Sequence, residues 1–382
     1  MKIGILTFHR STNYGAQLQA YALQRFLSLA GHDASVIDYW PDYRREREQL
    51  FSLSELRELK TTAKLVYILT RLLTCVRFLK RRRAARTFAE KHLNKTPSSR
   101  ESQRGADRFD VVVYGSDQIW RKFQRTTFKG YDPVYFGQGY SAGETPAYQV
   151  VAKRRITYAA SMGPVAFDTE DDKAFFKNNM QNFDAVSVRE DGLQTLLAEE
   201  FAVTAAKVCD PTLLLSADDW SGLVDNRYVP ACPYILYYRL NPNSTADRFV
   251  ERLSASRCVK VVEMRGKIPL MHYGSRYRLT AGPEAFLSLL SGAQCVVSTS
   301  FHGVALSIRL QKQFYFVSKD KNANRAMSLL ADLGLQNRRV TDWRSHPLDD
   351  HIDYSRCENK LNDMTAKSRG WLLSNIESYN SF

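Results

Sequence analysis

The sequence predicts an α/β protein made of two Rossmann-like domains that face a cleft. Short apolar segments with the character of buried strands alternate with segments of helical periodicity in both halves of the chain. Polar or basic residues follow several of these strands, and the carboxyl edge of a parallel sheet is where ligands bind in such folds. A strongly basic helical stretch, residues 41–105, interrupts the first series of strands and helices.

The composition is that of a globular protein with unevenly spread charge. The 382 residues suffice for two or three domains. Of the net charge of +14, the 41–105 window holds +10, from 17 Lys/Arg and 7 Asp/Glu. The six cysteines form no CxxC pair, which is typical of reduced cysteines in a cytoplasmic protein. We expect no signal peptide and no membrane-spanning segment, because no apolar run is long enough.

The first domain is expected to span residues 1–216 and to begin with a βαβ unit. The unit consists of a strand, a helix and a second strand, predicted at 2–8, 16–30 and 34–39. The loop before the helix contains Asn13, Tyr14 and Gly15, which either line a ligand site or simply form a turn. Because the loop lacks a GxGxxG pattern, it predicts no dinucleotide site.

Residues 41–105 form a basic helical insertion in this domain, with a helix predicted over most of 50–88. Apolar residues recur on one face of that helix: Leu65, Ile68, Leu72, Val76 and Leu79. Arginines and lysines crowd around this face, a pattern typical of helices that lie on an anionic membrane surface. The alternative is a solvated helical excursion. We expect no nucleic-acid partner, because no DNA- or RNA-reading motif accompanies the helix.

A strand predicted at 109–115 runs into Asp117 and Gln118, which places a carboxylate and an amide at the edge of the sheet. The alternative role of Asp117 is to cap a helix.

Arg189 ends a short strand predicted at 185–189. A guanidinium in that place can bind a carboxylate or phosphate through two parallel hydrogen bonds. The alternative is an ion pair with Glu190 or Asp191.

After a linker at 217–233, a second series of strands and helices is expected over 234–345. Within it, a buried strand is predicted at 295–297 and a helix at 303–310, with Ser300 as the N-cap. His302 would then lie where a strand turns into a helix, a place that favours anions and suits a proton-transfer group. Alternatively, His302 only packs or caps the helix. The cleft would hold Asn13, Asp117 and Arg189 on one side and His302 on the other.

Six short motifs follow one another along the chain: NYGAQLQ at 13–19, VYGSDQIW at 113–120, YAAS at 158–161, SVRE at 187–190, DPTLL at 210–214 and SFHG at 300–303. Together they resemble the polysaccharide pyruvyl transferase family, from residue 1 to about Arg338 outside the basic insertion. The resemblance implies a fold similar to the GT-B glycosyltransferases, and a C-terminal segment, 346–382, whose helix (predicted at 359–379) crosses back to the first domain.

The resemblance also implies an activity. Pyruvate would pass from phosphoenolpyruvate to two hydroxyls of a sugar, forming a cyclic ketal, with no cofactor or metal. The acceptor would be a precursor of a surface polysaccharide, often carried on a polyprenyl lipid, and the protein would work in the cytoplasm at the inner face of the membrane. A lipid carrier of this kind would explain why the chain has a basic insertion.

Residue roles follow from the same resemblance. Arg189 and His302 match the arginine and the histidine that hold phosphoenolpyruvate, and His302 would transfer the proton. Ser300 stands where many relatives have arginine, so another cation is needed; Arg265, Arg309 and Arg325 are candidates, of which we favour Arg325 because its helix follows the next strand. The helix start from Ser300 to Gly303 would stabilise the phosphate. The acceptor would be bound by Asn13, Tyr14, Gly15, Asp117 and Gln118, with Asp117 as the base.

Two other functions stay open. The first is a GT-B glycosyltransferase that uses a nucleotide-sugar, for which Glu284 is the only nearby carboxylate that would bind the ribose. The second is a non-catalytic glycan- or membrane-binding protein.

Overall fold

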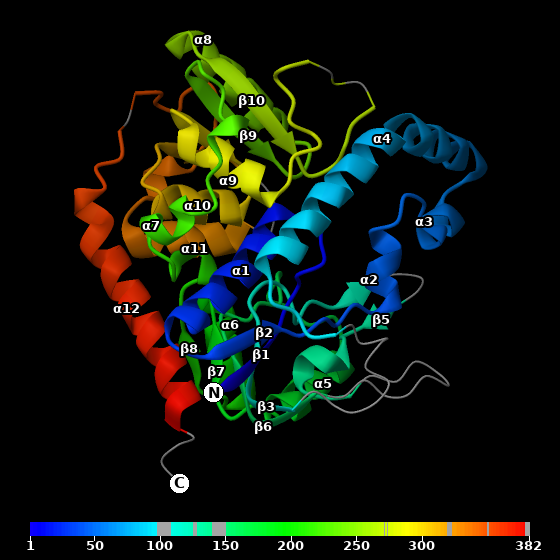
Figure 1. The fold of residues 1–382 in the computed structure, drawn as a ribbon, viewed down its shortest axis with the longest axis vertical. Helices are drawn as coiled ribbons and strands as arrows, with labels where there is room; N and C mark the ends of the chain where they lie inside the picture. Colours follow the sequence, from blue (N-terminus) through cyan, green and yellow to red (C-terminus); the bar gives the residue numbers. More distant parts are fainter. Residues whose placement is uncertain are drawn as a thin grey trace.

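The computed structural model describes residues 1–97, 108–124, 128–139, 150–270, 272, 274–318, 323–349 and 351–378. Residues 98–105 of the predicted insertion and residue 379 of the predicted last helix lie outside these ranges. Figure 1 shows two α/β units stacked one above the other, with long helices along their sides. Both units contain a parallel sheet, so the predicted fold class is confirmed.

The first sheet has the order β2-β1-β3-β6, and all its neighbours are parallel. Its strands are β1 (Lys2–Leu6), β2 (Asp33–Val36), β3 (Arg108–Tyr114) and β6 (Val151–Thr157). The three consecutive valines of β3 are all buried, as expected for a parallel strand covered on both faces. Two further parallel strands, β7 (Val186–Val188) and β8 (Ala205–Lys207), continue this unit through bridges from Ile156 to Ala185 and from Ala160 to Val188.

The second sheet has the order β10-β9-β11-β12 and is also parallel throughout. Its strands are β9 (Tyr234–Arg239), β10 (Lys260–Arg265), β11 (Cys295–Ser298) and β12 (Phe314–Phe316). The helices of this unit are α8 (Ser244–Arg257), α9 (Pro283–Gly292), α10 (Phe301–Arg309) and α11 (Asn324–Leu333).

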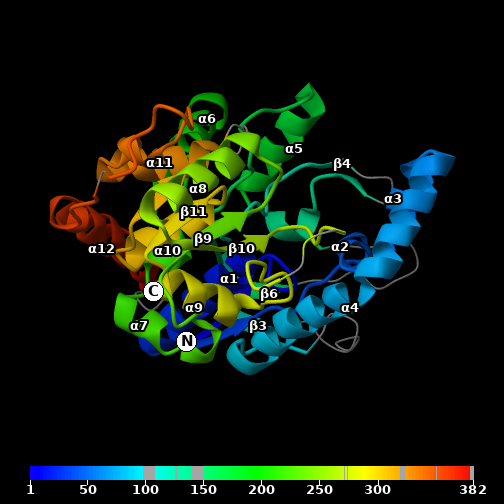
Figure 2. The same ribbon diagram turned by 90° about the horizontal axis from the view of Figure 1, so that it is seen from above.

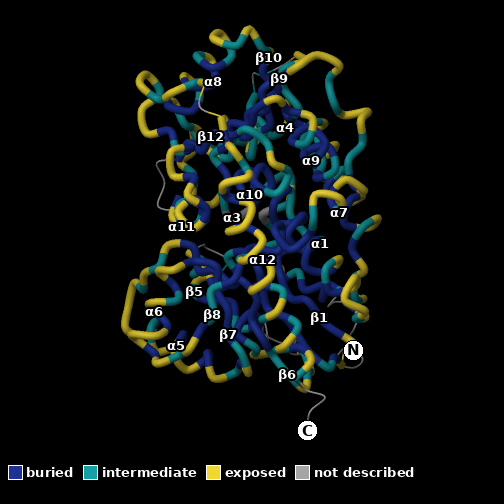
Figure 3. Tube along the Cα trace, turned by 90° about the vertical axis from the view of Figure 1, so that its left-hand side faces the viewer, coloured by how far each residue is buried: buried dark blue, intermediate teal, exposed yellow. Residues whose placement is uncertain are grey.

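The two units are joined by tight packing at the start of α1 (Tyr14–Leu29). The ring of Tyr14 stacks on Phe286 of α9, with the centroids 5.4 Å apart. One apolar cluster contains both Ile5 of the first sheet and Val296 of the second, and Figure 3 shows buried chain running without a break between the units. The carboxyl ends of β1, β7 and β11 therefore meet in the middle of the molecule.

The basic insertion contains three helices: α2 (Asp42–Arg47), α3 (Leu53–Glu58) and α4 (Thr61–His92). The prediction that most of 50–88 is helical is confirmed, with one break where Leu59 and Lys60 are extended and separate α3 from α4. Figures 1 and 2 show the C-terminal half of α4 lying along the body, while its N-terminal half and α3 project from it.

The last helix, α12 (Ser355–Glu377), runs down the opposite side of the molecule (Figure 1). It touches the first unit at several points: Ser368 Oγ accepts a hydrogen bond from the backbone N–H of Cys209 at 2.9 Å, and Arg369 donates to the carbonyl of Leu214. The remaining elements are β4 (Phe123–Gln124), β5 (Lys129–Gly130), α5 (Glu170–Met180), α6 (Asp191–Phe201), α7 (Ala217–Ser221) and the 3-10 turns η1 (Pro133–Phe136), η2 (Pro211–Leu213), η3 (Asn226–Tyr228) and η5 (Gln336–Arg338).

Candidate active site

Arg189, directly after β7, is the centre of a buried cluster of charges. Its Nη1 donates to Asp210 Oδ2 at 2.6 Å, and its Nε donates to Glu190 Oε1 at 3.3 Å. Its Nη2 lies 3.6 Å from Asp117 Oδ1 but has no hydrogen-bond partner among the described residues. The pair with Glu190 was one of the alternatives from sequence. The pair with Asp210 is shorter, so it is the stronger restraint on the guanidinium.

Asp117 owes its position to an unusual backbone after β3. Gly115 has φ +129°, and a Cβ there would overlap the Tyr158 carbonyl, so only glycine fits. Asp117 itself has φ +68°, a left-handed conformation that aspartate tolerates better than most residues. No α-helix follows it, which excludes the capping role. Burial would raise the pKa of Asp117, but the charges of Arg189 and Arg325 outweigh burial and hold this pKa below its usual value.

His302 lies in the first turn of α10, whereas the sequence predicted it in the turn just before the helix. The helix begins at Phe301, two residues before the predicted start, and the capping prediction is wrong in its detail. The Ser300 side chain makes no capping hydrogen bond; the Ser300 N–H instead donates to Ser298 Oγ at 3.0 Å. Ser300 nevertheless occupies the N-cap position, so the free N–H groups of this helix start lie beside His302.

The imidazole of His302 is buried and in contact with the opposite domain. A Cβ on Gly15 would overlap the ring, which explains glycine at that position. His302 Nε2 lies 3.7 Å from Asp210 Oδ2 and has no hydrogen-bond partner in the part of the chain that the structure describes. Burial lowers the pKa of His302 below 6.5, although the nearby carboxylates of Asp210 and Asp117 oppose this shift. Burial therefore favours the neutral form of the ring.

Of the three arginines considered from sequence, Arg325 at the start of α11 reaches the charge cluster. Its Nη1 is 3.8 Å from Asp117 Oδ1, and its guanidinium lies 5.8 Å from the ring centroid of Phe301. Burial and the neighbouring Arg189 lower the pKa of Arg325 to about 10. Arg309 instead donates to the Leu213 carbonyl at 2.6 Å, and Arg265 is paired with Glu263.

The residues predicted to bind an acceptor are spread around this centre. Asn13 caps α1, with its Oδ1 accepting the Gly15 N–H at 3.1 Å, which confirms its turn role. The ring of Tyr14 is enclosed by Tyr238 and Phe286, and its hydroxyl has no partner among the described residues. Gln118 is half-buried beside Gly163. Gly303 packs against Ser298 and Tyr238, where a Cβ would overlap the Ser298 hydroxyl.

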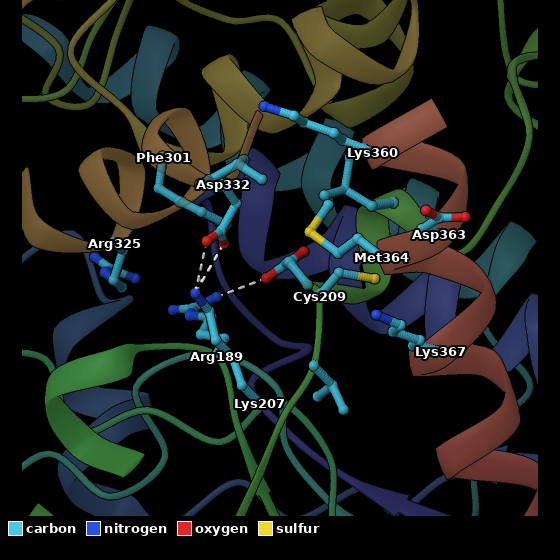
Figure 4. A pocket seen from close by; sticks show the side chains of 14 residues that line it. Arg189, Lys207, Cys209, Phe301, Arg325, Asp332, Lys360, Asp363, Met364 and Lys367 are labelled. Carbon is cyan, nitrogen blue, oxygen red and sulfur yellow. Dashed lines mark hydrogen bonds and ion pairs between the residues drawn. The ribbon is translucent and has the colours of Figure 1, made fainter. Parts of the chain in front are cut away.

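A cavity of about 350 Å³ opens beside the cluster, between both units and α12. Figure 4 shows Arg189 and Arg325 on one side of it and Lys360 and Lys367 of α12 on the other. The other lining residues are Lys207, Val208, Cys209, Asp210, Leu213, Phe301, Leu329, Asp332, Asp363 and Met364. Lys207 is paired with Asp191 and Asp332. Lys360 and Lys367 form no ion pair within the described part of the chain, so the wall has cations free to meet an anion.

The arrangement suits an anionic organic ligand better than a metal. Among the residues that the structure describes, no group of three or more His, Cys, Asp or Glu side chains is placed to hold a metal ion. Two buried guanidiniums and a helix N-terminus converge instead, and these are the groups that bind carboxylate and phosphate oxygens.

Comparison with known proteins assigns the chain to a family. The sequence profile of the family described as polysaccharide pyruvyl transferase matches residues 13–321. The chain belongs to this family. The match covers Asn13, Asp117, Arg189 and His302, so the residues that gather between the domains lie within the family region. A comparison with curated proteins gives no match.

Solved structures similar to this polysaccharide pyruvyl transferase family member share little sequence with it. UDP-GlcNAc 2-epimerase from Neisseria meningitidis, bound to UDP-GlcNAc, is 9% identical with a TM-score of 0.47, over 98% of this chain and 99% of that chain. MnaA of S. aureus, in complex with UDP, is 12% identical with a TM-score of 0.48, over 100% of this chain and 97% of that chain.

Sequence reasoning missed several charged residues of the site. Asp210 was noticed only as part of a motif, although it follows β8 just as Arg189 follows β7. The same edge rule that singled out Arg189 would have placed Asp210 beside it. No local signal identified Lys360 and Lys367, since they reach the cavity only because α12 packs against the first unit.

Proposed function

We propose that this protein transfers pyruvate from phosphoenolpyruvate to two hydroxyls of a sugar, forming a pyruvate ketal on a precursor of a surface polysaccharide. Family membership supports the reaction class. The observation that carries the proposal for the donor is the meeting of Arg189 and Arg325, from two domains, at one basic-walled cavity, with His302 Nε2 3.7 Å from Asp210 of the cavity wall.

The donor is a small molecule with a carboxylate and a phosphate. Arg189 Nη2 and Arg325 Nε are buried N–H groups without a hydrogen-bond partner in the described chain, and a buried donor group normally has one. A carboxylate or phosphate oxygen would satisfy both. Each charge-assisted hydrogen bond would contribute about 1.5–3 kcal/mol to binding.

The reaction also needs a proton at C3 of the donor. His302 is placed to supply it, because its Nε2 is unpartnered in the described chain and it lies beside both guanidiniums. A phosphate bound nearby would raise the pKa of His302, so the ring would take up a proton as the donor binds. Proton transfer by a positioned side chain increases a reaction rate about 10²–10⁴-fold.

The proposed reaction consists of two additions of a sugar hydroxyl to C2 of the donor. One sugar hydroxyl adds to C2 while C3 takes the proton from His302 and becomes a methyl group. The second hydroxyl adds to C2 as the bond from C2 to the phosphate oxygen breaks. Of the two hydroxyl protons, one restores His302 and the other leaves with phosphate. Asp117, kept ionised by the arginines, is the candidate base for the first hydroxyl.

The nucleotide-sugar alternative is weakened by the position of its candidate residue. Glu284 is paired with His92 at 2.6 Å and with Lys91 at 3.1 Å, both on α4. The carboxylate of Glu284 is therefore already paired with side chains of the insertion.

Calorimetric titration of phosphoenolpyruvate into the protein tests the donor. We expect binding by the wild type, weaker binding by Arg189→Ala, and loss of turnover in a folded His302→Ala protein. UDP-GlcNAc is titrated in parallel. Absence of phosphoenolpyruvate binding, with and without candidate sugars, would contradict the proposed donor.

A further inference from the structure

Helix α4 carries an apolar face whose residues are exposed among the residues that the structure describes. We define the apolar stripe as the eight residues of this face: Leu65, Val66, Ile68, Leu69, Leu72, Leu73, Val76 and Leu79. Their exposed fractions lie between 37% and 66%. At 1.5 Å per residue the stripe is about 21 Å long, and such a contiguous apolar surface on a folded protein usually marks a contact site.

The stripe is held in place by the other side of the same helix. Thr74, Arg81, Ala85 and Phe88 are buried against the body of the protein. Arg81 Nη1 donates to the Arg265 carbonyl at 2.7 Å in the second unit, and its Nη2 donates to the Thr12 carbonyl at 3.2 Å in the first. The helix is thus fixed to both units, and the stripe faces away from them.

The charged residues of α4 indicate which kind of partner binds the apolar stripe. From Thr61 to Ala89, α4 contains eight Lys/Arg residues and no Asp or Glu. Lys80, Arg82 and Arg83 form no ion pair with any residue that the structure describes, and they lie at the end of the stripe. Leucine and valine flanked by unpaired cations fit lipid tails beneath anionic headgroups. Two copies packed stripe to stripe with parallel helices would set these cations against each other.

We infer that the apolar stripe docks α4 in the interface of an anionic lipid membrane, with the helix lying in the plane of the surface. The described chain contains no helix long and apolar enough to cross a bilayer. Arg81, on the opposite face of α4, binds the carbonyl next to Asn13, so docking sets the start of α1 about 10 Å, one helix diameter, behind the lipid-facing side. The delivery of a lipid-linked sugar to that side rests on the proposed function; the docking itself does not.

Co-sedimentation of the full chain with vesicles tests the inference without any substrate. We expect binding to vesicles of equal parts phosphatidylglycerol and phosphatidylcholine, weaker binding to phosphatidylcholine alone, and similarly weakened binding at high salt. Leu69→Glu combined with Leu72→Glu should abolish sedimentation. Leu29→Glu is the matched control, because Leu29 is equally exposed, at 52%, on α1 away from the stripe. Lys80→Gln combined with Arg83→Gln should weaken binding about thirtyfold.

Two results would overturn the inference. The first is a wild-type protein that does not sediment with anionic vesicles, or a Leu69→Glu/Leu72→Glu variant that binds as well as Leu29→Glu. The second is a wild-type dimer in analytical ultracentrifugation that the stripe variant converts to a monomer, which would assign the stripe to a second copy. Phosphoenolpyruvate titration of the stripe variant distinguishes failure of the docking inference from failure of the proposed reaction. An unchanged donor affinity shows that the cleft is intact, whether or not the protein binds vesicles.

Discussion

Replacement of Arg325 by glutamine separates donor binding from fold stability. The guanidinium lies 3.8 Å from Asp117, yet its pKa is lowered to about 10, mainly by burial and then by Arg189. The folded protein therefore disfavours this charge when no anion is present. Asp117 keeps Arg189 at 3.6 Å when Arg325 is lost. We expect the melting temperature of Arg325→Gln to stay the same or to rise.

Donor affinity should respond in the opposite way. Loss of one charge-assisted contact of about 1.5–3 kcal/mol corresponds to a Kd for phosphoenolpyruvate that is roughly 10–150 times higher. The assay is calorimetric titration beside differential scanning calorimetry of the same samples.

Arg309→Gln is the matched control, because it removes the same group from the same domain. Arg309 donates to the buried Leu213 carbonyl, so its loss should cost about 1–3 kcal/mol of stability and leave donor affinity unchanged. An unchanged Kd in Arg325→Gln, or a weakened one in Arg309→Gln, would refute the assignment of Arg325.

Three further changes test other contacts of the site. Arg189→Ala leaves buried carboxylates without their main cation and should lower the free energy of unfolding by about 3–5 kcal/mol in urea titration. Gly15→Ala should lower the melting temperature because its Cβ overlaps His302, whereas Gly370→Ala, at a helical glycine with open space around it, should not. Burial holds the pKa of His302 below 6.5, and a bound anion raises it. Donor binding should therefore take up a proton and weaken as pH rises through the pKa of the complex. His302→Asn should abolish this uptake, measured by calorimetry in buffers of different ionisation enthalpy.

The sequence predicted the parts of the site that depend on local order along the chain. An apolar strand followed by a helix start places His302 at the sheet edge whatever else the protein does, and Arg189 follows from the same rule. The exact helix start was beyond this reasoning. Ser300 looked like the capping side chain, but its side chain makes no capping hydrogen bond, and its own N–H donates to Ser298 Oγ.

Features that depend on packing between distant segments were not predictable. The period of Leu65, Leu72 and Val76 gave the apolar face of α4 correctly. The sequence did not show that the opposite face is buried, with Arg81 bound to backbone carbonyls of both units. Periodicity locates a face on a helix but does not say which face meets the protein.

The charges around Arg189 connect donor binding with the proton that the proposed reaction needs. Arg189 and Arg325 face the carboxylates of Asp117, Glu190 and Asp210. The two arginines therefore offer no surplus positive charge to a trianion. Burial raises the pKa of Glu190 and lowers that of His302. A bound phosphate would raise the pKa of both groups. Protons taken up on these two groups would turn the site positive enough to hold the donor. The proton gained by His302 in this way is the one that C3 requires, so binding itself would load the catalytic acid.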